Sequence, residues 1–277
     1  VVHSSFDPAT MASGSVGTGP FVLESHEVGV KSVSVKNEGF DWWGYSAGRE
    51  CPLDRNEYID YGTDPAAWLA AAEADEVDCF YENVGEYVDV MEGIGWENSE
   101  IATGSTILIR PNQTTPDADG NTVYADKRVR QALAMAVDNN ICLELGYANK
   151  GAPADNHHAG SMHPEHDPSV GRLPYDPAKA KALMAEAGMA DYEHELISID
   201  DDWRKNTTDA VAAQLRDAGI KVKRTILPGS TFWNDWAKYP FSSTNWNHRP
   251  FAVQVWGLAY RSGEAWNEMG WSNAEFD

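Results

Sequence analysis

The stretch Glu195–Leu227, ELISIDDDWRKNTTDAVAAQLRDAGIKVKRTIL, decides the fold class of this chain. It begins with the apolar run Glu195–Ile199 and ends with a second strand-like run, Ile220–Leu227. A strand, a helix and a second strand in this order form a parallel pair with a right-handed crossover. The stretch therefore predicts an α/β protein.

The helix of this unit lies between the two strands. Thr207 or Thr208 can cap its start, because a threonine hydroxyl accepts a hydrogen bond from a free backbone amide. Val211 and Leu215, four residues apart, mark its buried face, and Gly219 ends it. Ligands of open α/β sheets bind beyond the carboxyl ends of the strands. The loop Asp200–Trp203 is thus a candidate pocket edge.

Outside this unit, four predicted helices each begin after an aspartate, the residue type that caps helix starts. The four caps are Asp64, Asp126, Asp138 and Asp176. Predicted strands cover 21–23, 28–35, 77–80 and 105–110. A polar loop over 111–122 separates two parts of the chain, and we place a lobe boundary near its end.

Composition limits the function classes. The 277 residues carry 43 acidic and 21 basic side chains, for a net charge of -22. That field repels polyanions, so nucleic acid is excluded as an expected partner. No run of apolar residues is long enough to span a membrane. Three separated cysteines, Cys51, Cys79 and Cys142, allow either one disulfide and one thiol or three buried thiols.

Tryptophan is unusually abundant, with eleven in the chain and six of them between 233 and 271. Most of these side chains are expected in the core. Some are expected to form pocket walls, because indole offers a large apolar area with little rotamer entropy.

Six segments, in order along nearly the whole chain, resemble extracellular solute-binding protein family 5, which serves peptide and nickel ABC importers. They are Gly17–Phe21 (G-T-G-P-[FY] in the family), Asn37–Gly44 (N-x-x-Y-W-G), Glu73–Asp78 (A-L-x-x-G-E-V-D), Val129–Asp138 (V-R-Q-A-L-x-x-A-I-D), Tyr175–Gly188 (Y-D-P-x-K-A-K-x-L-L-x-x-A-G) and Asn273–Asp277 (N-x-x-[FY]-D). Asp75 stands where the family usually has glycine.

The resemblance implies a type 2 periplasmic-binding-protein-like fold, in which two lobes close on a solute and then dock on permease subunits. It implies no catalysis and no cofactor, a monomer, and a place in the periplasm or at the outer face of the cytoplasmic membrane. Compared with family members, the chain is expected to lack N- and C-terminal parts, including a signal peptide. On that comparison, 1–127 is the returning part of lobe I and 128–277 is most of lobe II.

The resemblance also indicates a ligand site. Trp246 matches a position after which peptide-binding members carry an aspartate that holds the ligand's amino terminus. That aspartate is absent here, and His248 and Arg249 stand nearby. A guanidinium favours a carboxylate or phosphate, so a peptide-like or acidic solute is expected, although an ordinary ion pair would also explain Arg249. The remaining candidate ligand-binding residues are Trp203, Phe232, Trp233 and Tyr260.

Two other functions stay open. Four imidazoles and two carboxylates lie within 157–167, a composition that can bind nickel or zinc, directly or through a metallophore. The candidate metal ligands are His157, His158, His163 and His166, and exposed loop histidines are the simpler interpretation. A carboxylate-dependent hydrolase rests only on acidic pairs such as Asp201-Asp202, which 43 carboxylates produce by chance.

Overall fold

The computed structural model describes residues 7, 10, 17–81, 83 and 85–277. The chain divides into two compact units, 1–71 and 72–277, and each is described by itself. None of the described helices combines the length and the apolar character needed to cross a membrane. The assignment of 1–127 and 128–277 to two lobes stays a prediction.

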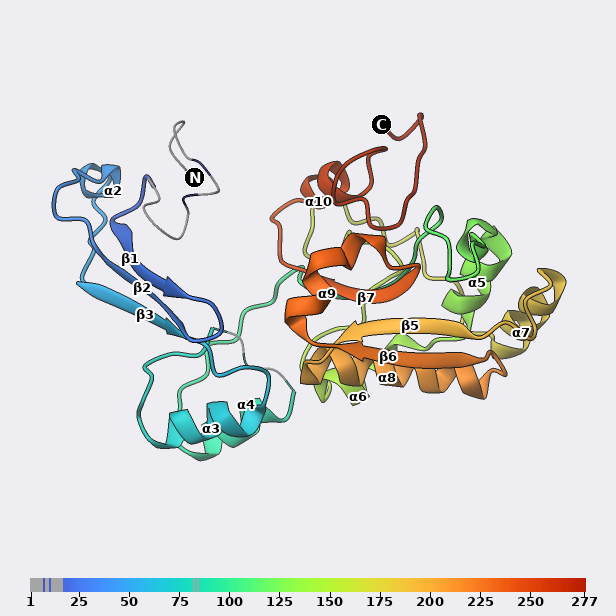
Figure 1. Ribbon diagram of the computed structural model, residues 1–277, viewed down its shortest axis with the longest axis horizontal. Helices are drawn as coiled ribbons and strands as arrows, with labels where there is room; N and C mark the ends of the chain where they lie inside the picture. Colours follow the sequence, from blue (N-terminus) through green and yellow to red (C-terminus); the bar gives the residue numbers. More distant parts are fainter. Residues whose placement is uncertain (1–6, 8–9, 11–16, 82, 84) are drawn as a thin grey trace. The chain divides into compact units, whose positions relative to one another are not determined.

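The first unit is built on an antiparallel three-stranded sheet (Figure 1). Its strands are β1 (Phe21–Glu27), β2 (Lys31–Lys36) and β3 (Arg55–Ile59), paired in the order β1-β2-β3. The predicted strand over 28–35 is wrong at its start, because Val28 and Val30 lie in the turn that joins β1 and β2. A short helix α2 (Trp43–Ser46) follows β2, and α3 (Pro65–Glu73) begins after Asp64, which accepts a hydrogen bond from the Ala66 amide.

The second unit is the α/β part that the sequence predicts. Its sheet has the order β4-β7-β5-β6, with β5 parallel to both β6 and β7, and β4 antiparallel to β7. The strands are β4 (Thr106–Pro111), β5 (His194–Ile199), β6 (Val222–Leu227) and β7 (Phe241–Trp246). Its helical elements are α4 (Tyr87–Gly93), η2 (Val123–Ala125), α5 (Lys127–Met135), α6 (Asn139–Tyr147), α7 (Pro177–Glu186), α8 (Asp202–Asp217), α9 (Gly229–Asp235), η3 (Trp236–Lys238) and α10 (Ala252–Ala259).

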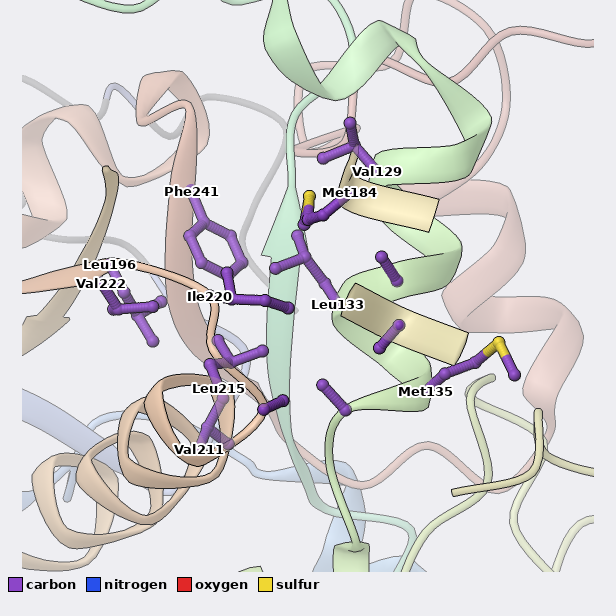
Figure 2. Packing of buried hydrophobic residues seen from close by; sticks show 14 of the residues in the cluster. Val129, Leu133, Met135, Met184, Leu196, Val211, Leu215, Ile220, Val222 and Phe241 are labelled. Atoms are coloured by element: carbon purple, nitrogen blue, oxygen red, sulfur yellow. The ribbon is translucent and has the colours of Figure 1, made fainter. Parts of the chain in front are cut away.

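The main core lies between the sheet and helices α5 and α8. Figure 2 shows Leu133 of α5 and Leu215 of α8 near Phe241 of β7, which is 1% exposed. The predicted caps of three helices are confirmed in this unit. Asp126, Asp138 and Asp176 each accept a hydrogen bond from a backbone amide in the first turn of α5, α6 and α7.

Two further local predictions were wrong. Residues 77–80 form no strand. Helix α8 begins at Asp202, so Thr207 and Thr208 lie inside the helix and do not cap it. Their hydroxyls donate to the carbonyls of Trp203 and Arg204 one turn back, at 2.7 and 2.6 Å, a bond that lets threonine sit within a helix. The Asp200–Trp203 loop is correspondingly shorter than expected, because Asp202 and Trp203 belong to the first helical turn.

Helices α6 and α8 pack closely at Gly146, which gives a testable result. A Cβ at Gly146 would lie 1.9 Å from Thr207 Oγ1 and 2.9 Å from Thr207 Cα. Gly146→Ala is therefore expected to destabilise the protein by about 1–3 kcal/mol in urea unfolding, although alanine is the better helix former. Gly257→Ala is the control, because nothing lies within 4 Å of that Cβ in α10, and it should stabilise by about 0.5–1 kcal/mol. Equal effects of the two changes would contradict the close packing at Gly146.

Candidate functional site

The candidate site begins at the carboxyl edge of the sheet. Strands β5, β6 and β7 are parallel, so their carboxyl ends share one edge. Strand β7 ends at Trp246, β6 leads through Pro228 into α9, and β5 leads into the start of α8. This is the edge at which α/β sheets bind ligands.

Four indoles gather there, and we name Trp233, Trp236, Trp246 and Trp266 the tryptophan cluster. Trp236 is central, with ring centroids 6.4 Å from Trp233, 6.4 Å from Trp246 and 6.3 Å from Trp266, all edge-on. Trp246 is 6% exposed, whereas Trp233 and Trp266 are 42% and 46% exposed. The outer members thus present indole surface to solvent, and the inner ones hold them in place.

A buried imidazole extends the cluster. The His158 ring lies 5.6 Å from Trp246 and 5.3 Å from Tyr260, and its side chain is 4% exposed. Neither ring nitrogen has a hydrogen-bond partner among the described residues. Burial, followed by the neighbouring His157 and His163, lowers the pKa of His158 to about 4. The ring is therefore neutral at neutral pH and packs as part of an aromatic wall.

A buried ion pair lies behind this wall. Arg110 of β4 and Glu268 form the pair, and they are 2% and 1% exposed. The Glu268 carboxylate also accepts from Trp246 Nε1 at 2.8 Å and from the Thr244 hydroxyl at 2.9 and 3.0 Å. Burial raises the pKa of Glu268 and lowers that of Arg110, while the mutual attraction of the two charges opposes both shifts.

Arg249 follows the end of β7, and it differs from most other arginines of the chain in its lack of a carboxylate partner among the described residues. Its Nη1 donates only to the backbone carbonyls of Asn247 and His248, at 3.4 and 3.1 Å. Within the described part of the chain, no carboxylate lies in ion-pair range of this guanidinium. His248 is tied to the start of β4, because its Nδ1 accepts from the Gly104 amide at 2.9 Å. An unpaired cation in so acidic a chain remains free to bind an anionic group.

The structure brings some of the predicted site residues together and separates others. Trp233, Trp246 and Tyr260 belong to one chain of ring contacts through Trp236 and His158. Phe232 is fully buried and packs with Ile197 and Ile199, so it supports the edge from inside the core. Trp203 is 7% exposed and packs instead against Tyr147 and beneath the Arg204 guanidinium.

Of the four candidate metal ligands, His158 packs against Trp246 and Tyr260, and the other three contact different partners. His157 Nε2 contacts the Val170 carbonyl, His163 Nε2 contacts the Arg249 carbonyl, and His166 pairs with Asp155 at 3.5 Å. Within the ranges that the structure describes, no three histidine, cysteine or acidic side chains are grouped as a metal site. The loop that carries these histidines is instead bonded to α10, because the first two amides of that helix donate to the Glu165 carboxylate. The three cysteines are free thiols.

A polar cavity of about 470 Å³ opens elsewhere, at the start of α6. Asp138, Asn139, Arg172 and Tyr175 are among its lining residues. None of the residues predicted to bind a ligand or a metal lines it.

Sequence reasoning missed Arg110 and Glu268. Glu268 lies in a run of polar and aromatic residues that gives no sign of burial. Arg110 does give a signal, because it directly follows the apolar strand residues Ile107–Ile109. An arginine inside such a strand requires a buried partner. Nothing local indicates that the partner stands 158 positions further along the chain.

The mixed α/β architecture, with the sheet order β4-β7-β5-β6, is that of a type 2 periplasmic-binding-protein-like fold. Solved structures show the same fold. The oligopeptide-binding protein AppA of Bacillus subtilis, in complex with a nonapeptide, matches with a TM-score of 0.74 at 22% identity, over 94% of this chain and 53% of that one. NikA of Staphylococcus aureus, in complex with Ni(L-His)2, matches with a TM-score of 0.76 at 18% identity, over 95% and 55%.

The chain belongs to family 5 of the bacterial extracellular solute-binding proteins, because the model of the middle region of that family matches residues 2–267. Heme-binding protein A of Haemophilus influenzae is 30% identical over 191 residues, 65% of this chain and 31% of that protein. The nickel-binding periplasmic protein of Escherichia coli is 29% identical over 177 residues, 62% and 31%. The chain thus spans about a third of the length of these curated relatives and about half of the solved ones.

Proposed function

We propose that this protein is the substrate-binding component of an ABC importer. It captures a small peptide-like or acidic solute by closure of two lobes and delivers it to permease subunits, without catalysing a reaction. It acts as a monomer in the periplasm or at the outer face of the cytoplasmic membrane. Family membership supports this proposal, and so do the names of relatives that bind peptides, nickel and heme.

The observation that carries the solute class is the unpaired Arg249, three residues after Trp246 of the tryptophan cluster. A guanidinium binds a carboxylate or phosphate through paired, charge-assisted hydrogen bonds. The exposed faces of Trp233 and Trp266 offer apolar contact to the body of a solute. The two features together favour a ligand with an acidic group and an apolar or ring-bearing body. In this proposal Trp246, His248 and Tyr260 serve as the wall and support of the ligand site.

A matched peptide series tests the role of Arg249. The tripeptide Ala-Phe-Ala, its N-acetyl form and its C-terminal amide differ only in their end charges. If Arg249 anchors a carboxylate, amidation should weaken binding about 10–100-fold in calorimetry, whereas acetylation should change it little. Arg249→Gln should remove the difference between acid and amide. Arg261→Gln is the control, because Arg261 is half exposed and already paired with Glu264 at 3.5 Å.

The outcomes separate the alternatives. A greater loss on acetylation would show that the amino terminus is the anchor and would contradict the role of Arg249. If no tripeptide binds, a thermal-shift screen with dicarboxylates, sugar phosphates, oligosaccharides, Ni²⁺ and Zn²⁺ follows, because a ligand that binds only the folded state raises the melting temperature. A shift with metal alone, lost in His157→Ala and His158→Ala, would favour the metal-binding alternative. Turnover of ester or glycoside substrates would favour the hydrolase.

A further inference from the structure

The buried pair Arg110–Glu268 contacts three of the four members of the tryptophan cluster. Glu268 Oε1 accepts from the Trp246 indole at 2.8 Å, and the Glu268 amide donates to the Trp266 carbonyl at 2.9 Å. Arg110 Nη2 donates to the Trp236 carbonyl. These tryptophans come from three separate segments: η3, the end of β7 and the loop after α10. The pair is therefore the point at which three separate segments are joined.

The hydrogen bonding around the pair is extensive. Arg110 Nη1 donates to the Glu268 carbonyl at 2.6 Å, and Asn112 Nδ2 donates to the same carbonyl at 2.9 Å. The Thr244 hydroxyl lies 3.0 and 2.9 Å from the two carboxylate oxygens. Arg110 Nε makes ion-pair contact with the Glu268 carboxylate without hydrogen-bond geometry, and the other groups named here are hydrogen-bonded. A buried polar network joined by this many bonds holds its members in a single arrangement.

We infer that Arg110 and Glu268 are positioning residues, which set the orientation of the tryptophan cluster for solute binding. Stability alone does not explain the pair, since well-packed apolar residues in place of a buried ion pair are often as stable or more so. The directionality of hydrogen bonds does explain why the pair is present. Apolar contact leaves an indole free to tilt, whereas the hydrogen bond to Glu268 fixes the ring of Trp246, against which Trp236 and Trp266 pack edge-on.

The inference rests on the proposed function where it links the pair to solute binding. The orientation of the rings can be tested without that function. Glu268→Gln keeps the size and an acceptor oxygen while removing the charge that faces Arg110. Arg110→Lys keeps the charge but replaces the five donors of the planar guanidinium with three donors on a single nitrogen, which cannot reach all of the Arg110 acceptors. Both variants should alter the exciton couplet of the tryptophans in the circular dichroism of the ligand-free protein. Trp246→Phe identifies the contribution of that ring to the couplet.

A second measurement uses N-acetyl-Ala-Phe-Ala as the probe. We expect Glu268→Gln and Arg110→Lys to weaken its binding about tenfold or more. Gly146→Ala is the stability control, because it disturbs the α6–α8 contact and touches no member of the cluster. It should lower the melting temperature and leave both the couplet and the probe affinity unchanged.

The results distinguish this inference from the proposed function. An unchanged couplet in both charge variants would overturn the positioning role, whatever the probe does. Equal changes in Gly146→Ala would also overturn it, by showing that lost stability is the cause. A changed couplet in a protein that binds no tripeptide would support the positioning of the rings and count against the proposed peptide-like ligand.

Discussion

Glu268→Ala is expected to lower the free energy of unfolding by about 3–5 kcal/mol, because it leaves the buried Arg110 guanidinium without its counter-charge. Arg110 is 2% exposed, so water cannot replace the lost carboxylate without local opening. The Trp246 indole and the Thr244 hydroxyl lose their acceptor in the same step. Urea unfolding followed by tryptophan fluorescence measures the loss.

The double variant Arg110→Met, Glu268→Leu is the control for this prediction. It removes both charges and keeps apolar volume, so part of the stability should return. The recovery is incomplete, since the carbonyls of Trp236 and Glu268 lose the donor Arg110. A double variant less stable than Glu268→Ala, or a single-variant cost under about 1 kcal/mol, would show that Arg110 keeps its charge solvated by other means.

Local patterns in the sequence were sufficient to predict the framework of the second unit. An aspartate before a helix acts through its own side chain on an amide two or three residues away, so Asp126, Asp138 and Asp176 could be identified without the fold. The strand–helix–strand unit is also confirmed, because it too was predicted from residues that are close together in the sequence. The prediction for Thr207 was wrong because a threonine hydroxyl can either accept from a following amide at a cap or donate to a carbonyl one turn back inside a helix. The sequence does not distinguish the two.

The candidate site could be predicted only in part. The rule that ligands bind beyond the carboxyl ends of parallel strands points to Trp246 and to α9, where the indoles gather. It does not decide which face of a short helix is buried, so Phe232 and Trp233 could not be told apart until the helix was packed. The ion pair depends on a contact across 158 residues and on the antiparallel pairing of β4 with β7. Neither is a local property.

Acid is expected to destabilise the protein through two buried imidazoles. His194 of β5 is fully buried; its Nδ1 lies 3.1 Å from the Tyr124 hydroxyl, and its Nε2 has no partner among the described residues. Burial lowers the pKa of His194 to about 4, and that of His158 falls to about 4 as well. An unfolded histidine titrates near pH 6.5, so between about pH 6.5 and 4 the unfolded chain binds protons that the native protein does not.

Stability should therefore fall as the pH is lowered through that window, by roughly 3 kcal/mol for each imidazole at pH 4. The measurement is the free energy of unfolding at constant ionic strength from neutral to acid pH, in the parent and in His194→Asn. Asparagine retains an oxygen near Tyr124 and carries no titratable group. The carboxylates contribute equally to both proteins, so they cancel in the difference between the two curves. Parallel curves would show that His194 does not stay neutral in the native state. If the difference in unfolding free energy between the parent and His194→Asn shrinks as the pH falls, protonation of the buried imidazole is what destabilises the parent. The apolar packing of Tyr124 and Phe241 around the ring offers no group that could stabilise the added charge.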